Sequence, residues 1–229
     1  MIAAIEQQIK NYTQKVIQGQ VRCSVKICPR CEQQPDFFKR HDVRQRQFLV
    51  IVERLVVKAV SFLVRMKCTL CGKTFTEYPS FAFPYKRYVS QEIMERTLRY
   101  LQDDTMTYER ATLAQNTVAT RGRSPPGQPL PIFHPDPVKA PRLAASTIHR
   151  WVTTLGGLTQ TLRAATNLLL EKDTDIHRLC FDVPARKYRS PQRRSLLQDG
   201  LRLFHAEAQC QVLFNRSIFP ELGIRHGWQ

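Results

Sequence analysis

Two Cys-x-x-Cys motifs limit the possible folds of this chain more than any other feature of its sequence. Cys28-Pro-Arg-Cys31 and Cys68-Thr-Leu-Cys71 are separated by residues 32–67. Each motif places two thiols on one side of a tight turn, and two such turns supply the four sulfurs of a closed, tetrahedral zinc site. Basic residues flank both motifs and offset the negative charge of four thiolates. The sequence therefore predicts a Cys₄ site with structural Zn²⁺ as the cofactor.

The alternatives to a metal site are a redox-active pair and a set of unrelated buried cysteines. A redox Cys-x-x-Cys motif belongs to a thioredoxin-like βαβ pattern, which neither pair shows. Cys180 and Cys210 fit ordinary core positions, and so does Cys23, for which replacing one of the four ligands is the alternative. A site with four sulfur ligands has no open position for a substrate, so we expect the zinc to stabilise the fold and to do no chemistry.

The charge balance points to a polyanionic partner. Against 19 Asp and Glu stand 35 Lys and Arg, a formal net charge of +16. Such an imbalance is usually tolerated where the partner is DNA, RNA or an anionic membrane, and a simply basic soluble protein is the alternative. No stretch approaches the roughly 18 consecutive apolar residues of a membrane helix, and the N-terminus lacks a secretory signal. We therefore expect a cytoplasmic, nucleoid-associated protein without a membrane partner.

The pattern of apolar residues predicts an α+β fold, in which a β-rich zinc ribbon precedes a mostly helical region. Residues 1–21 have a helical apolar stripe, and residues 22–84 form the ribbon, with two strands, as in a hairpin, over residues 46–67. Residues 85–172 are expected to form a helix-turn-helix DNA-binding domain with a proline-rich insert at 117–142, and residues 173–229 a basic helical region. Further elements are expected as helices from about Ser90, over 107–114, 146–157, 158–172 and 191–214, and as a strand over 178–183.

The helix expected from Ser146 has the features of a DNA-recognition helix. Ser146 is predicted to cap it, which leaves Thr147, His149 and Arg150 near the exposed first turn. Arg150 is the strongest candidate, because a guanidinium can bridge guanine O6 and N7 or bind a phosphate. His149 fits either a solvated residue or a DNA contact. Trp151 lies on the inward face and fits a core anchor, with stacking on a base as the alternative.

Three segments resemble a known family when they are taken in order. MKCTLCGKTFT, YPSFAFPYKRYVSQEIMERTLRYL and STIHRWVTTLG resemble the N-terminal region of bacterial insertion-sequence transposases and their stand-alone, non-catalytic relatives, over roughly residues 26–158. The resemblance implies zinc at the four cysteines and DNA contact around Ser146, Thr147 and Arg150. The chain departs from the family in the insert at 117–142, which separates helices that a compact helix-turn-helix joins by a few residues.

A catalytic centre of the transposase type is not expected. That chemistry needs three carboxylates that hold two metal ions. Asp182 follows an apolar stretch as a first catalytic aspartate would. The other acidic residues near it and downstream of it are better interpreted as solvated carboxylates. These residues are Asp173, Asp175, Asp199, Glu207 and Glu221. We therefore expect a protein that is not an enzyme and has no small-molecule substrate.

A basic cluster lies in the C-terminal region and suits phosphate contacts, with docking of an acidic protein as the alternative. The complete set of predicted DNA-binding residues is Arg142, Ser146, Thr147, His149, Arg150, Arg186, Lys187, Arg189, Arg193 and Arg194.

The leading hypothesis for function is a zinc-dependent, site-specific protein for double-stranded DNA. It would be associated with a mobile genetic element and would act as a targeting or recruitment factor for transposition or other nucleoprotein machinery. The alternatives are a truncated or split transposase that needs a partner chain for catalysis, and a protein–protein adaptor that docks on a nucleoprotein complex.

Overall fold

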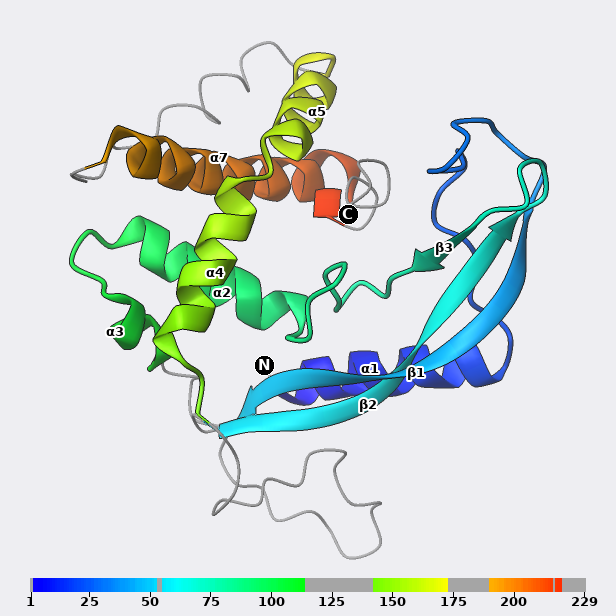
Figure 1. Ribbon diagram of the computed structural model, residues 1–229, viewed down its shortest axis with the longest axis horizontal. Coiled ribbons are helices and arrows are strands. Elements are labelled where there is room, and N and C mark those ends of the chain that lie inside the picture. The colour runs from blue at the N-terminus through cyan, green and yellow to red at the C-terminus, as the bar shows by residue number, and fades with distance from the viewer. Residues whose placement is uncertain (1, 53–54, 114–141, 173–189, 216, 220–229) are drawn as a thin grey trace, which may run out of the picture. The chain divides into compact units, whose positions relative to one another are not determined.

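The computed structural model describes residues 2–52, 55–113, 142–172, 190–215 and 217–219 (Figure 1). The fold is α+β, as predicted. The chain divides into two compact units, Met1–Glu92 with Leu113–Leu143, and Ile93–Thr112 with Ala144–Gln229. The strand predicted at 178–183 and nearly all of the insert at 117–142 lie outside the described residues.

The first unit is built around a long antiparallel hairpin. Strand β1 (Phe38–Val52) pairs with β2 (Leu55–Cys68), and the short strand β3 (Thr74–Glu77) pairs with the other edge of β2, which gives the order β1-β2-β3. The two strands predicted over 46–67 are confirmed. The hairpin extends further than predicted, because Phe38 pairs with Cys68 at its open end, and β3 was not predicted.

The two faces of the hairpin differ because successive side chains of a strand point to opposite sides. One face is buried, as one side of an antiparallel sheet commonly is. Its core residues are Phe48, Val50, Val57 and Ala59. The alternating residues form what we call the open face, Gln45, Gln47, Lys58 and Val60, which are all exposed to solvent.

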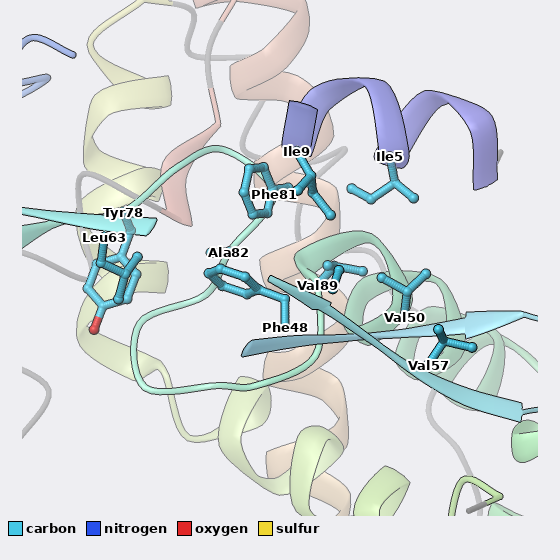
Figure 2. Packing of buried hydrophobic residues seen from close by; sticks show 11 residues of the cluster. Ile5, Ile9, Phe48, Val50, Val57, Leu63, Tyr78, Phe81, Ala82 and Val89 are labelled. Carbon is cyan, nitrogen blue, oxygen red and sulfur yellow. The ribbon is translucent and has the colours of Figure 1, made fainter. Parts of the chain in front are cut away.

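Helix α1 (Ile2–Ile17) covers the buried face of the hairpin. Its residues Ile5 and Ile9 pack with Val50, Val57 and Val89, as Figure 2 shows. The predicted helical stripe is therefore confirmed. The helix ends two residues before Gly19, whose φ of 71° is readily adopted by glycine.

The second unit is helical. Helix α2 (Ser90–Gln102) begins in the first unit and continues into the second, which also contains α3 (Tyr108–Thr112), α4 (Ala145–Gly156), α5 (Thr159–Leu170) and α7 (Pro191–Phe214). A helix is present at each position where the sequence predicted one. Among the described helices, none has both the length and the apolar character that crossing a bilayer requires.

Helix α7 organises the packing of the second unit, because α4 and α5 both contact it. The inward face of α4 is fully apolar, and Trp151, which is 3% exposed, is a core anchor as predicted. Helix α4 approaches α7 closely at Gly156, where an added Cβ would lie 2.1 Å from the carbonyl oxygen of Leu196. Gly156 is the last residue of α4 and Gly157 is its C-cap, close to the predicted end at residue 157.

The prediction that Ser146 caps α4 is wrong. The helix begins one residue earlier, at Ala145, and its N-cap is Ala144, which has no side chain that can accept a hydrogen bond. The first turn closes through the backbone instead, since the N–H of Thr147 donates to the carbonyl of Ala144 (2.9 Å). By contrast, Thr107 caps α3 with its side chain, because its hydroxyl accepts the N–H of Arg110 (3.1 Å).

Candidate metal centre

The hairpin brings the two cysteine motifs together at its open end. Cys28 and Cys31 lie in the loop that leads into β1, whereas Cys68 is the last residue of β2 and Cys71 lies in the turn before β3. Because β1 starts at the residue that pairs with Cys68, the loop before β1 and the turn after β2 meet. The predicted convergence of these four cysteines is confirmed.

The spacing of the four sulfurs fits a tetrahedral metal site. The Sγ atoms of Cys28 and Cys71 are 3.9 Å apart, those of Cys31 and Cys68 are 4.0 Å apart, and all four lie within 4.8 Å of one another. Metal–sulfur bonds of about 2.3 Å in a tetrahedron place neighbouring sulfurs about 3.8 Å apart. The distances are far too long for disulfides, whose S–S bond is about 2.05 Å. The arrangement suits one ion with four sulfur ligands.

The backbone of the two turns is equivalent residue by residue. In the first turn, the N–H of Cys28 donates to Gln33 (2.9 Å) and the carbonyl of Cys28 accepts from Glu32 (2.9 Å). In the second turn, Cys68 donates to Lys73 (3.0 Å) and accepts from Gly72 (3.0 Å). The same pattern of hydrogen bonds thus orients both pairs of thiols, as second-shell bonds do in metal sites.

The surroundings of Cys68 and Cys31 shift the pKa values of these two thiols in opposite directions. The backbone N–H groups of Cys71 and then Leu70 lower the pKa of the Cys68 thiol to about 7. The backbone of Gln33 lowers the pKa of Cys31, but desolvation and the neighbouring thiols raise it by more, to about 12. Thiolates this close together repel one another, so a cation is needed to hold all four in the charged form that binds a metal.

Cys23 lies outside the cluster of four sulfurs. Its thiol donates to the carboxylate of Glu77 (3.6 Å), which also accepts the N–H of Ser24 (3.3 Å). Burial is the main cause that raises the pKa of the Cys23 thiol to about 12. The alternative that Cys23 replaces a ligand is therefore not favoured. Cys210 is buried, as predicted, and Cys180 lies outside the described residues.

The residues predicted to contact DNA on and near α4 lie on the surface. Arg142, Ser146, His149 and Arg150 are exposed, and Thr147 is half-buried. The guanidinium of Arg150 lies along the helix, where it donates to the carbonyl of Ser146 (3.4 Å) and the hydroxyl of Thr147 (3.5 Å). Within the second unit, Ser146, Thr147 and Arg150 are therefore joined by hydrogen bonds in the first turns of α4.

The predicted C-terminal basic cluster is described only in part. Arg186, Lys187 and Arg189 lie outside the described residues, and Arg194 is exposed at the start of α7.

Arg193 is engaged within the second unit. Its guanidinium donates to the hydroxyls of Thr153 (3.0 Å) and Tyr108, and it lies 5.9 Å from the centre of the Tyr108 ring. The edge of His149 meets the same ring at 5.3 Å. Arg193 therefore holds α3, α4 and α7 together, and DNA contact by this residue stays a prediction.

The carboxylates considered for catalysis do not assemble into a site within the described residues. Asp173, Asp175, Asp182 and Glu221 lie outside those residues, and Asp199 forms an ion pair with Arg202 (3.1 Å).

The interpretation of Glu207 as a solvated carboxylate is wrong. The residue is 2% exposed and accepts hydrogen bonds from the N–H of Ile218 (2.8 Å) and from Gln211 (2.6 Å). A buried carboxylate needs such donors, so Glu207 is a structural residue that fixes the end of α7.

A second feature of the first unit was not predicted from the sequence. A groove of about 490 Å³ lies on the open face of the hairpin. Its lining residues are Gln45, Arg46, Gln47, Leu49, Lys58 and Arg87. The glutamines at alternate positions of β1 indicate that this face is solvated. The contact of Arg87 with the hairpin could not be predicted, because it joins segments that are far apart in the sequence.

Comparison with known proteins gives one similarity. A family model described as a domain of unknown function (DUF6431) matches residues 28–116. The matched segment starts at Cys28 and includes all four cysteines of the cluster, the hairpin, and helices α2 and α3. The comparisons with curated proteins and with solved structures gave no match. The fold and site thus define an α+β protein with a Cys₄ cluster at the open end of a hairpin.

Proposed function

We propose that the four cysteines bind one structural zinc ion, and that the protein is a site-specific binder of double-stranded DNA associated with a mobile genetic element. In this role it would target or recruit transposition or other nucleoprotein machinery. Zinc is the metal that a closed, all-sulfur, tetrahedral donor set suits best. The ion would neutralise the thiolates and join the loop before β1 to the end of β2, and with four protein ligands it would leave no position for a substrate.

The observation that supports DNA binding most strongly is the two-sided character of α4. Ile148, Trp151 and Val152 are buried, and they hold the helix on its unit. The exposed side of the first turns presents His149 and Arg150 beside Thr147. A helix that is anchored on one face and carries polar donors near its N-terminus has the properties of a major-groove reading helix.

The charge of the chain supports the same proposal. A net charge of +16 attracts a polyanion over distances of several ångströms, and each phosphate contact releases counterions. Binding to DNA should therefore weaken steeply as salt rises. The zinc-loaded protein is first used to select its preferred site from random duplexes, and its affinity for that site and for an unrelated duplex is then measured at several salt concentrations.

The decisive variant in this measurement is Arg150→Ala. If Arg150 contacts a base, its loss weakens binding to the selected site by about 1–3 kcal/mol and reduces the preference over the unrelated duplex. Arg163→Ala is the matched control, because Arg163 is an exposed arginine on α5 of the same unit. A wild-type protein that binds no duplex at low salt contradicts the proposal.

A second candidate function, a protein–protein adaptor, is favoured by the apolar residues beside the metal centre. Leu70, within the second motif, is 61% exposed, and Phe37, which directly precedes β1, is 56% exposed. The two residues lie near each other, because the hydroxyl of Thr69 donates to the carbonyl of Phe37 (3.1 Å). Exposed apolar groups that lie close together often mark contact sites. An adaptor would bind naked DNA weakly, and Leu70→Ser would abolish partner binding while leaving the zinc content unchanged.

A further inference from the structure

We propose that the open face of the hairpin, together with Arg87, is a second contact surface for the phosphate backbone of double-stranded DNA. This inference rests on the proposed function, because it takes DNA as the partner. It assigns the contact to the first unit, to residues that are independent of α4 and of the metal ligands.

The backbone explains how Arg87 reaches the hairpin. The N–H of Leu49 donates to the carbonyl of Arg87 (2.9 Å), and the N–H of Val89 donates to the carbonyl of Leu49 (3.1 Å). These bonds attach residues 87–89 to the outer edge of β1 in the parallel sense. The Arg46 guanidinium fixes the same segment by donating to the carbonyl of Lys86 (3.1 Å). Three hydrogen bonds between β1 and residues 86–89 thus hold Arg87 beside the hairpin.

The hairpin itself places the other groups on one surface. Lys58 pairs with Leu49 across the strands, and Gln47 pairs with Val60, so that the side chains of the open face point the same way. Strand β3 pairs only with Val64–Lys67, further along β2. Strand β3 therefore does not lie beside the residues of the open face. The Val60 side chain on this face is 41% exposed.

The groove on this surface has the chemistry of a phosphate-binding site. Arg46, Lys58 and Arg87 supply positive charge to its lining, and the amides of Gln45 and Gln47 supply further N–H donors. None of the residues that line the groove is acidic. Arginine, lysine and glutamine are all among the side chains that bond phosphate oxygens in protein–DNA complexes.

The charges of Lys58 and Arg87 are not neutralised within the described part of the chain. Both side chains are exposed, and neither has a hydrogen bond or an ion pair with a described residue. Two other surface cations do have carboxylate partners, in the pairs Lys10–Glu6 (2.7 Å) and Arg44–Asp42 (2.9 Å). A solvated sheet face ordinarily mixes both signs of charge, so this concentration of cations favours an anionic partner.

The preference for DNA over an acidic protein follows from the shape and the donors of the surface. A β-ribbon is one of the elements that proteins lay on a duplex. Glutamine side chains beside cations add directional N–H donors, which protein–DNA complexes commonly aim at successive phosphates. An acidic protein is therefore an outcome that the experiment must separate.

The test uses the full zinc-loaded chain and the double variant Lys58→Gln/Arg87→Gln. Its matched control is Lys15→Gln/Arg163→Gln, which removes the same charge from exposed positions on α1 and α5. Affinity for a duplex is measured from 0.05 to 0.3 M salt, and affinity for polyglutamate is measured in parallel. Loss of two phosphate contacts should reduce the magnitude of the slope of log K against log salt by about 1.8, and should weaken binding about tenfold near 0.2 M salt.

The outcomes separate this inference from the proposed function. A reduced slope for the hairpin variant but not for the control supports the second surface. If the wild type binds DNA and Arg150→Ala weakens it, but the hairpin variant behaves as the control does, only the second surface is overturned. Loss of polyglutamate binding with unchanged DNA binding also overturns it. If the wild type binds no duplex, the proposed function fails, and this inference fails with it.

Discussion

Glu32 and Gly72 occupy equivalent positions in the two Cys-x-x-Cys turns. Each directly follows the second cysteine of its motif, and each has a left-handed backbone, with φ of 57° and 70°. Glycine adopts this conformation readily, whereas a residue with a Cβ is destabilised by roughly 1–2 kcal/mol. The two turns thus have the same backbone, but only the second has the residue best suited to it.

Introducing glycine at position 32 and removing it from position 72 should have opposite effects on stability. Glu32→Gly is expected to raise the free energy of unfolding of the zinc-loaded protein by up to about 1 kcal/mol, and Gly72→Ala to lower it by about 1–2 kcal/mol. An added Cβ at Gly72 meets only the end of Lys67, at 4.0 Å, so the effect comes from the backbone. Urea unfolding of the two variants measures both changes, and a change of the same sign in both would contradict the equivalence of the turns.

Loss of one ligand should remove the metal. Cys68→Ser is expected to reduce the zinc content from about one ion per chain to a small fraction, because one of the four sulfurs of a closed site is missing. Elemental analysis of the purified protein measures this content. Cys23→Ser is the control, since Cys23 bonds Glu77 outside the cluster. Zinc loss in the control, or full zinc content in Cys68→Ser, would show that the ligand set is different.

Tyr108 should make the second unit sensitive to alkaline pH. Burial, followed by the hydrogen bond with Tyr100, raises the pKa of Tyr108 from 10.0 to about 12. Between these two values the unfolded chain loses the phenol proton and the folded chain keeps it, so stability falls as pH rises from 10 to 12. Tyr108→Phe should remove this part of the decline in urea midpoints, and Tyr85→Phe, at a position 63% exposed, should leave it in place.

The two glycines at the end of α4 should respond very differently to alanine. Gly156→Ala places a Cβ 2.1 Å from the backbone oxygen of Leu196 and should lower the free energy of unfolding by about 3 kcal/mol or more. Gly157 has a right-handed backbone, with φ of −82° and ψ of −2°, so Gly157→Ala should change it by less than about 1 kcal/mol. Thermal unfolding of the variants distinguishes these effects. Equal losses would mean that α7 does not approach α4 this closely.

Features that depend on local spacing could be predicted from the sequence. The two Cys-x-x-Cys motifs could be assigned to one site from the sequence. Each motif places two thiols on one side of a turn, and a closed tetrahedral site needs four sulfurs. The stripe of Ile5, Ile9 and Val16 identified α1 because it repeats at helical spacing. The hairpin was found only from residue 46 onwards, since residues 38–45 are mostly polar and have no apolar alternation to reveal a strand.

Features that depend on tertiary contacts could not be predicted in this way. Ser146 is a good capping residue, but the packing of α4 starts the helix one residue earlier, so the serine lies inside it. The strand β3 is too short to have a pattern of its own and forms because β2 offers it an edge. The groove beside Arg87 forms because residues 87–89 are hydrogen-bonded to β1. Neither segment has a sequence pattern that predicts this attachment.

The four cysteines at the open end of the hairpin also affect the register of its two strands. Cys68 sits opposite Phe38, so a metal that ties the loop before β1 to the end of β2 prevents one strand from slipping past the other. A slip of β1 by one residue would turn Gln47 towards the core and Phe48 towards solvent. If the four cysteines bind a metal as proposed, its removal would therefore disturb the open face of the hairpin as well as loosen the two turns.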